Sequence, residues 1–335
     1  MSFSAELDGK TILITGGTGS FGHQMIYELM EYSPKKIIVY SRDEEKQHNM
    51  RETFRKYPIS KKIDYIIGDV RDYVRLVNAS KNVDIIFHAA AMKQVPYIES
   101  HPYEAVKTNV IGAYNIMRAA VENKVDYVVG ISTDKAVKPI NAMGMTKAIQ
   151  EKILLGDDID KENTKISCVR YGNVIGSRGS VIPLFDEKIS KQESLPITHP
   201  MMTRFMLTLK EAIQLVFYAI KVSEGGEIFV KKAPNVKILE FAKAYAKIKT
   251  GNPNYPLEYV GIRPGEKLYE VLVSSEEMRR TVQKEDYFII KKQTNFYDSE
   301  SLNEKTSLEE YSTLTEPSID YNKVEKIIEE EKWIN

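Results

Sequence analysis

The chain has 335 residues, and its lysines plus arginines equal its aspartates plus glutamates at 47 each. This balance leaves no overall field to attract nucleic acid or an anionic membrane, although it is compatible with a local basic site for a phosphate ligand. The hydrophobic content of 42% and the charged content of 28% are ordinary for a globular protein. A chain of this length forms one two-lobed unit or two closely joined domains with a large core.

Cysteine and histidine usage limits the covalent and metal chemistry. Cys168 is the sole cysteine, so no intrachain disulfide forms, in agreement with a reducing cytoplasm. Glu6 and Asp8 precede the first apolar run, unlike a secretory signal, and no apolar stretch reaches the roughly 18 residues of a membrane span. The five histidines are scattered without ligand spacing. We therefore expect a cytoplasmic protein with no metal site.

The first half of the chain alternates predicted strands with predicted helices. Short apolar runs predict strands at residues 11–15, 36–40, 64–67, 83–88, 127–132 and 166–171. Helical patterns lie between them, for example at about 21–30 and 105–123. Apolar strands without strict alternation indicate a parallel sheet that is covered on both faces. Because crossovers are right-handed, we predict an α/β doubly wound sheet of the Rossmann type, with ligands at the carboxyl ends of its strands.

The alternation breaks after Tyr171. Residues 172–200 are rich in glycine, proline and polar side chains; a helix is predicted at about 207–220 and a returning strand at 227–231. From about residue 235 we expect a smaller mixed lobe, and from about 298 a strongly charged tail. Within that tail, residues 324–333 predict either a short docking helix or a solvated segment with one anchored turn.

A glycine cluster directly follows the first strand and opens the first helix. Gly16, Gly19 and Gly22 have the spacing G-x-x-G-x-x-G. Glycines at such positions permit a tight turn, a close approach of the backbone to a pyrophosphate, and close packing of helix on strand. The helix amino terminus then offers N–H groups to the phosphates. We predict a dinucleotide site contacted by Gly16, Thr18, Gly19, Ser20, Phe21 and Gly22; a purely structural turn is the alternative.

The end of the second strand bears on the choice between NAD and NADP. An NAD site places an acid there to hold the ribose 2′-hydroxyl. Here Ser41 and Arg42 suit a 2′-phosphate, because a hydroxyl and a planar guanidinium both donate to it. Asp43 is the competing feature and suits a ribose. We favour NADP over NAD.

Later strand ends complete the predicted cofactor site. Asp69 and Val70 follow the third strand and are expected to flank the adenine. Ala89 and Ala90 follow the fourth strand, where small side chains allow the cofactor to lie close. We assign no chemistry to His88, because a lone histidine is more often structural.

Several motifs identify a known family. Residues 16–22, 88–91, 132–136 and 170–174 resemble those of extended short-chain dehydrogenase/reductases that act on nucleotide sugars. Residues 41–44, 92–96, 139–144, 202–206 and 263–267 are similar to the inverting UDP-N-acetylglucosamine 4,6-dehydratase/5-epimerases of capsule and O-antigen synthesis. The similarity runs from about residue 8 to about residue 290. It implies a lyase that works with catalytic NADP, a UDP-sugar substrate, and a homo-oligomer such as a hexamer. The family's usual route leads to N-acetyl-L-fucosamine for surface polysaccharide.

One catalytic position departs from the wider superfamily. That superfamily uses Tyr-x-x-x-Lys, in which the lysine lowers the pKa of the tyrosine base. Here Met143 occupies the tyrosine position and Lys147 the lysine position, where the resemblance also implies a cofactor contact. A thioether carries no proton, so Met143 is no base. The capsule-type branch of the family is similar in having methionine there. The acceptor of the substrate O4 proton is left open between Asp134, Lys135, a water, and Lys147 acting through the ribose hydroxyl.

The resemblance implies three further catalytic roles after the fifth strand. Asp134 is the acid at O6, Lys135 the base at C5, and Thr133 a hydrogen-bond partner of O4. A free aspartate titrates near about 4 and a free lysine near about 10.4. We therefore expect both pKa values to move towards neutrality, with Lys147 and the nicotinamide charge lowering that of Lys135. A strand-end salt bridge is the structural alternative for this pair.

The predicted substrate side carries cations that suit a pyrophosphate. The candidates on segments that resemble the family are Lys93, Arg170, Arg178, Arg204, Arg263, Asn173 and Glu266. Residues 176–179 look like a mobile loop over the site. Competing hypotheses are a UDP-sugar 4-epimerase, a retaining dehydratase, and a regulatory NADP-binding protein without turnover.

These assignments define the expected domains. Residues 1–175, with a returning segment at about 205–232, form the predicted NADP-binding domain. Residues 176–204 and 233–295 form the substrate lobe, and residues 296–335 form the charged tail. The expected partner is a UDP-sugar, with neither nucleic acid nor membrane.

Overall fold

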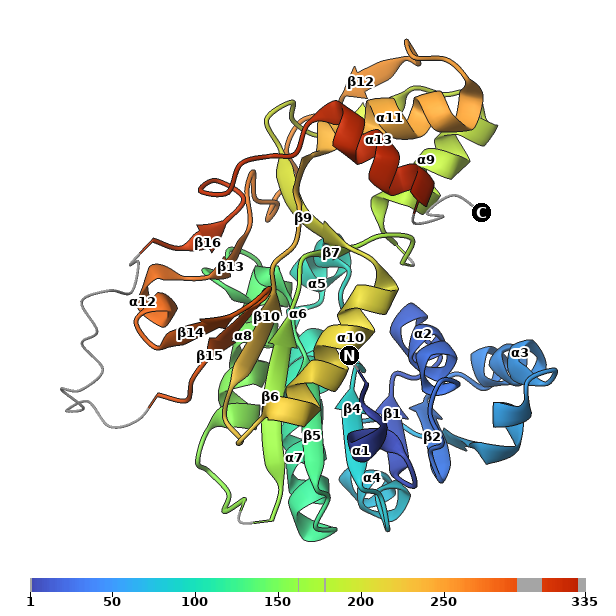
Figure 1. The fold of residues 1–335 in the computed structure, drawn as a ribbon, viewed down its shortest axis with the longest axis vertical. Helices are drawn as coiled ribbons and strands as arrows, with labels where there is room; N and C mark the ends of the chain where they lie inside the picture. The colour runs from blue at the N-terminus through green and yellow to red at the C-terminus, as the bar shows by residue number, and fades with distance from the viewer. Residues whose placement is uncertain (1, 162, 178, 294–308, 331–335) are drawn as a thin grey trace.

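A nine-stranded sheet organises the molecule (Figure 1). The computed structural model describes residues 2–161, 163–177, 179–293 and 309–330. The sheet order is β14-β15-β10-β6-β5-β4-β1-β2-β3. Its parallel strands are β1 (Thr11–Thr15), β2 (Lys36–Ser41), β3 (Ile63–Ile67), β4 (Ile85–His88), β5 (Tyr127–Ile131), β6 (Lys165–Arg170) and β10 (Ile228–Lys231). The predicted doubly wound α/β fold and its strands are confirmed.

Helices cover both faces of this sheet, because its central strands β1, β4 and β5 are apolar and buried on both sides. One core includes side chains of α2 (Ser20–Leu29), α3 (Glu44–Phe54) and α10 (Leu209–Val222). The core on the other face includes α4 (Tyr73–Ala79), α7 (Gly112–Glu122) and α8 (Ala142–Leu155). The shorter helical elements are α1 (Ser4–Leu7), a 3₁₀ turn (Pro58–Lys62) and α5 (Val95–Ser100). The helix predicted at 105–123 is interrupted: α6 (Pro102–Ala105) leads into a π-helical turn (Val106–Ile111) before α7.

A hairpin corrects the predicted domain boundary. β14 (Thr281–Lys284) and β15 (Tyr287–Ile290) belong to the large sheet, where β15 pairs antiparallel with β10. The sequence analysis placed them in the substrate lobe. The physical reason is side-chain alternation along β15: Ile289 enters the core on one face of the sheet, while Phe288 and Ile290 enter the core on the other.

The second lobe has its own core and small sheets. β7 (Asn173–Val174), β9 (Thr203–Leu207) and β11 (Asn235–Lys237) form one sheet; β8 (Leu195–Ile197) pairs with β12 (Leu257–Tyr259), and β13 (Val271–Val273) with β16 (Tyr311–Ser312). The helices are α9 (Val181–Ser190), α11 (Ile238–Thr250), α12 (Ser275–Met278) and α13 (Tyr321–Glu330). Side chains of α9, α11 and α13 share the third core.

The described part of the predicted tail is therefore folded into this lobe. Val324 and Ile328 of α13 are buried against α11, and Glu325 pairs with Lys247 at 2.7 Å. The docking helix is confirmed in place of a solvated tail, while Trp333 lies outside the described residues. Across those residues, the structure contains no helix with the length and hydropathy of a membrane span.

The docking of α13 predicts a measurable contribution to stability. Ile328→Ala removes a fully buried side chain, so we expect a loss of about 2–5 kcal/mol of unfolding free energy in urea titrations. Glu329→Ala, at an exposed position of the same helix, is the matched control with little change. Equal midpoints for the two variants would show that α13 does not stabilise the lobe.

Candidate functional site

A cleft of about 770 Å³ opens at the carboxyl ends of the parallel strands. Its walls come from the segments that follow β1, β2, β3, β4, β5 and β6, and from the start of α8. This is the edge at which doubly wound sheets bind ligands. Segments that are distant in the sequence therefore meet around one space.

The glycine turn forms one end of the cleft. Gly16 has φ +64°, and a Cβ there would stand 2.8 Å from the Ala90 backbone. A Cβ at Gly22 would stand 1.9 Å from the carbonyl oxygen of Gly17, so α2 packs on the turn only because Gly22 lacks a side chain. Gly19 is the N-cap of α2 and lines the cleft. Thr18, Ser20 and Phe21 also line it, whereas Gly22 acts through packing.

The end of β2 concentrates positive charge. Asp43 caps α3: its carboxylate accepts the Lys46 backbone N–H at 2.9 Å and the Lys46 ammonium at 2.5 Å. Ser41, Arg42 and Lys46 line the cleft beside it, and the Ser41 hydroxyl accepts a bond from Gln47 at 3.0 Å. Sequence analysis missed Lys46; its signal was a cation in the first turn of the helix after Ser41 and Arg42.

The predicted adenine and ribose segments lie along the same cleft. Asp69, Val70, Ala89 and Ala90 all line it. The Asp69 carboxylate binds Arg71 at 2.6 Å and stands 3.7 Å from the Arg42 guanidinium, so it helps to orient Arg42.

A short 3₁₀ turn after β5 (Asp134–Ala136) carries the predicted acid and base. Asp134 is fully buried, and its Oδ1 accepts from the Thr133 hydroxyl at 2.8 Å and the Lys135 ammonium at 2.9 Å. Its Oδ2 has no hydrogen-bond partner within the described chain. Thr133 and Lys135 line the cleft, and a quarter of the Lys135 side chain is exposed there. Proton donor and acceptor groups thus meet at the cleft wall.

The start of α8 places Met143 and Lys147 in the wall of the cleft. Asn141 caps this helix by accepting the Gly144 N–H at 2.7 Å. Met143 is buried in a small apolar cluster with Ile98. The Lys147 ammonium donates to the Ile131 carbonyl and to Gln150, each at 2.6 Å. Burial lowers the pKa of Lys147 to about 8, so this lysine changes charge close to neutral pH.

The pKa of Lys135 moves opposite to the expectation. Burial acts to lower it, but Asp134 and Glu270 outweigh that effect and raise it above the ordinary lysine value. The groups that act on it are Asp134, Glu270 and Arg204, and Lys147 is not among them as predicted. The sequence analysis had not foreseen a second carboxylate.

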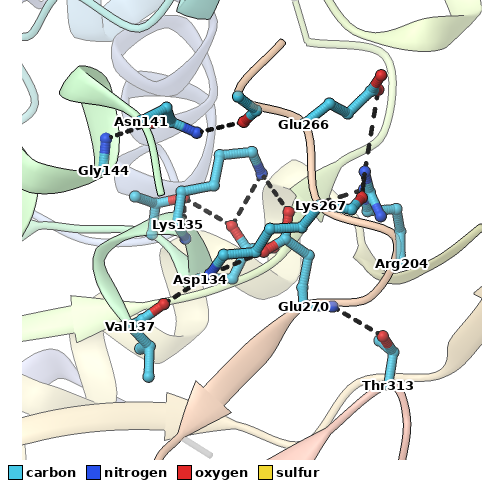
Figure 2. Close-up of polar contacts among 12 residues, drawn as sticks. Asp134, Lys135, Val137, Asn141, Gly144, Arg204, Glu266, Lys267, Glu270 and Thr313 are labelled. Atoms are coloured by element: carbon cyan, nitrogen blue, oxygen red, sulfur yellow. Dashed lines mark hydrogen bonds and ion pairs between the residues drawn. The ribbon is translucent and has the colours of Figure 1, made fainter. Parts of the chain in front are cut away.

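That second carboxylate comes from the other lobe, as Figure 2 shows. Glu270 is 1% exposed, and its Oε1 stands 3.6 Å from the Lys135 nitrogen and 3.9 Å from Arg204 Nε. Its Oε2 stands 3.7 Å from the Lys267 nitrogen. Glu270 and Lys267 were not among the predicted site residues. The sequence signal that could have indicated Glu270 is an acid directly before the apolar run 271–273.

Some of the predicted substrate residues line the cleft, and others lie outside its lining. Lys93 and Asn173 line the cleft, and Asn173 Oδ1 is buried without a hydrogen-bond partner in the described residues. Arg204, Arg263 and Glu266 lie outside the cleft lining. Arg204 donates to backbone carbonyls of Thr203, Lys267 and Leu268. Arg178 lies outside the described residues.

Arg170 requires a correction. It is buried, and its guanidinium binds Glu151 at 2.6 and 2.8 Å and Glu277 at 2.8 Å through two nitrogens. It does not line the cleft. Because its donors are already held by two carboxylates, the structure gives Arg170 a role in joining β6 to α8 and α12, in place of the predicted pyrophosphate contact.

Histidine supplies no ligand cluster. Within the described residues, no group of three or more His, Cys, Asp or Glu side chains could hold a metal ion. His88 bonds Thr15 at 2.8 Å, and burial lowers its pKa to about 3, which keeps it neutral inside the sheet.

Known proteins resemble the chain over most of its length. A family model described as polysaccharide biosynthesis protein matches residues 12–292. The inverting UDP-N-acetylglucosamine 4,6-dehydratase of Campylobacter jejuni (serotype O:23/36) is 44% identical over 298 residues, which cover 88% of this chain and 86% of the relative. The UDP-glucose 4-epimerase of Rickettsia bellii is 46% identical over 287 residues, which cover 84% of this chain and 82% of the relative.

Solved structures agree with this similarity. The X-ray structure of Pen from Bacillus thuringiensis has a TM-score of 0.89 and 34% identity, covering 98% of this chain and all of that chain. MoeE5 in complex with UDP-glucose and NAD has a TM-score of 0.63 and 20% identity, covering 76% of this chain and 87% of that chain. The second likeness shows the fold alone, on a protein that binds both a UDP-sugar and a nicotinamide cofactor.

The buried Arg170 network predicts a large effect on stability. Arg170→Met leaves Glu151 and Glu277 without their shared partner, so we expect a loss of about 3–5 kcal/mol in denaturant unfolding. Arg55→Met breaks an exposed ion pair with Glu52 and serves as the control with little change. If Arg170→Met had the stability of wild type but bound a UDP-sugar poorly, the result would support the original prediction that Arg170 contacts the substrate.

Proposed function

The chain belongs to the polysaccharide biosynthesis family, and on this premise we propose that it is an NADP-dependent inverting dehydratase of UDP-N-acetylglucosamine. The product is a UDP-4-keto-6-deoxy sugar with inverted C5. The observation that carries the proposal is the 2.9 Å hydrogen bond between the buried Asp134 and the adjacent Lys135, which lines the cleft. Loss of water across C5 and C6 needs one acid and one base on the same sugar, and this pair offers both.

The residues at the cofactor end fit NADP. The glycine turn and the amino terminus of α2 suit a pyrophosphate. Asp43, the residue that favoured NAD, is engaged by Lys46 and by the cap of α3. Ser41, Arg42 and Lys46 then offer a hydroxyl and two cations to a 2′-phosphate. When bound, the cofactor oxidises C4 and later reduces C6, so that its own redox state is restored.

The chain's residues divide the proton transfers. A ketone at C4 makes the C5 proton acidic. Uncharged Lys135 removes that proton, and protonated Asp134 gives its proton to the departing O6, which leaves as water. Thr133 orients O4 through its hydroxyl. In this elimination the pair gains one proton and loses one, so it keeps its total. When hydride returns to C6, a proton from solvent adds to the opposite face of C5, which balances the O4 proton released earlier.

Lys147 supports the route for the O4 proton. Met143 has no proton to exchange, and a lysine whose pKa is about 8 changes charge in the working range. We assign Lys147 as the group through which the O4 proton leaves, by way of the ribose hydroxyl. Lys93 and Asn173 line the cleft on the substrate side and bind the nucleotide part.

The main rival is a UDP-sugar 4-epimerase, the activity named for the relative from Rickettsia bellii. An epimerase acts at C4 alone, so it needs neither an acid at O6 nor a base at C5. It would leave the buried Asp134 and Lys135 pair without a role in the reaction. A regulatory NADP-binding protein would likewise have no use for the pair.

We place the reaction early in the synthesis of a UDP-N-acetyl-L-fucosamine type of surface polysaccharide precursor. A cytoplasmic homo-oligomer, such as a hexamer, remains the expected form of the enzyme.

The first test is the reaction itself. We expect purified protein with NADP and UDP-N-acetylglucosamine in deuterated water to give a 4-keto species with a C6 methyl group, deuterium at C5 and inverted C5. NMR spectra of the sugar report each feature. Retained C5 would indicate a retaining dehydratase. UDP-N-acetylgalactosamine as the sole product would replace the dehydratase by the epimerase, and no product with NADP bound would favour a binding protein.

A lysine variant tests the O4 route. Lys147→Arg keeps the positive charge but does not deprotonate in the working range, so we expect the rate of 4-keto formation to fall by about 10²-fold or more. Lys152→Arg, at an exposed position of the same helix, is the matched control at wild-type rate. A Lys147→Arg enzyme at wild-type rate would move the role to Asp134, Lys135 or a water.

A further inference from the structure

Glu270 is a buried carboxylate for which the proposed reaction has not yet given a role. It is 1% exposed and stands just before β13, in the second lobe. Its Oε1 is 3.6 Å from the Lys135 nitrogen, and its Oε2 has no hydrogen-bond partner in the described residues. A buried charge that is neither fully bonded nor in the cleft lining is costly, so its place beside Lys135 calls for a functional explanation.

The position of Glu270 is fixed by contacts between the two lobes. Its backbone N–H donates to Thr313 at 2.9 Å. Lys267 lies shortly before Glu270 in the chain and donates to the carbonyl of Val137 at 2.7 Å. Val137 directly follows the turn that carries Lys135. Arg204 donates to the Lys267 carbonyl at 2.8 Å. Figure 2 shows Asp134 and Glu270 beside the Lys135 nitrogen, whereas Thr313 contacts Glu270 and Lys267 contacts Val137.

The charged groups around Lys135 are two carboxylates and two cations. Asp134 and Glu270 favour its ammonium form, whereas Arg204 and burial oppose it. Lys267 stands behind Glu270, 3.7 Å from Oε2. The carboxylates prevail, and the pKa of Lys135 is raised. In the empty site Lys135 is therefore an ammonium, which is the wrong form for a base.

We propose that Glu270 is a positioning residue that holds Lys135 as an ammonium and so sets how readily Lys135 gives up its proton to become a base. This inference rests on the proposed dehydration. Before that reaction, the proton on the Lys135 nitrogen passes along the 2.9 Å hydrogen bond to Asp134 Oδ1. The N–H bond breaks, the O–H bond forms, and no other reactant is needed. The transfer makes a neutral base and a protonated acid together.

Ionised Glu270 opposes this transfer by stabilising the ammonium. Burial, and then Asp134, raise the pKa of Glu270 itself, while Lys135, Arg204 and Lys267 act against them. Glu270→Gln reproduces the uncharged side chain at every pH. Removing an opposite charge at this distance lowers the pKa of a lysine by about one unit or more. The variant therefore frees the base at lower pH.

The direct test measures the amine without turnover. Full-length protein without substrate is treated with acetic anhydride over a range of pH, and acetylation of Lys135 is quantified by peptide mass spectrometry. We expect the midpoint for Glu270→Gln to lie about one pH unit or more below wild type. Glu227→Gln is the matched control, because Glu227 is a buried carboxylate 3.6 Å from Lys291 at the far end of β10. Its Lys135 midpoint stays at the wild-type value.

A conservative variant separates charge from structure. Glu270→Asp keeps the negative charge and is expected to hold the midpoint closer to wild type than Glu270→Gln does. If Glu270→Gln is too unstable to label, a wild-type-like midpoint in Glu270→Asp together with a lowered midpoint in Glu270→Ala carries the same conclusion. An unchanged Lys135 midpoint in the neutral variants would overturn the proposal.

The kinetic consequence distinguishes positioning from scaffolding. The alkaline limb of kcat against pH, where the Asp134–Lys135 pair loses its shared proton, shifts to lower pH in Glu270→Gln, whereas a purely structural defect lowers kcat without moving the limb. Wild-type protein that forms no 4-keto product would refute the proposed function, yet the labelling midpoints would still decide the role of Glu270. Product formation with an unmoved limb and unmoved midpoint would refute only the role of Glu270.

Discussion

The buried hydrogen bond between Asp134 and Lys135 is the interaction on which the site depends. Opposite charges in a protein interior persist only when they are paired and held by further polar groups. Thr133 supplies one such bond within the same turn, and Glu270 supplies a second counter-charge from another lobe. The end of β5 therefore needs the second lobe to be closed against it. Fold and chemistry meet at Lys135, which pairs with Asp134 in its own turn and with Glu270 of the other lobe.

The absence of a tyrosine at position 143 changes how the neighbouring lysine is used. In the wider superfamily that lysine lowers the pKa of the tyrosine base. Here Met143 adds to an apolar wall, and the Lys147 ammonium is held by a carbonyl and an amide oxygen rather than by a carboxylate at hydrogen-bond distance. Burial then lowers its pKa to about 8. The pKa values of Lys135 and Lys147 thus shift in opposite directions. Two acids keep Lys135 charged, whereas burial prepares Lys147 to lose its proton.

The comparisons and the geometry address different questions. Relatives at similar identity carry the names of a dehydratase and of an epimerase, so similarity alone identifies the family without choosing the reaction. The choice rests on which chemistry needs the groups present. A 4-epimerase has no use for an acid and a base placed beside each other after β5, whereas elimination across C5 and C6 needs both.

The sequence by itself determined the doubly wound sheet, the glycine turn and the order of the strand ends, because these depend on local patterns of apolar and small residues. It also predicted one site for Thr133, Lys135 and Lys147, which all line the cleft at the carboxyl ends of the parallel strands. Only the tertiary structure decided what surrounds them. Glu270 lies 135 positions after Lys135 in the chain, Arg170 is held by Glu151 and Glu277, and β15 joins the large sheet. Charge balance and pairing across such separations depend on how distant segments pack, and no local pattern encodes that.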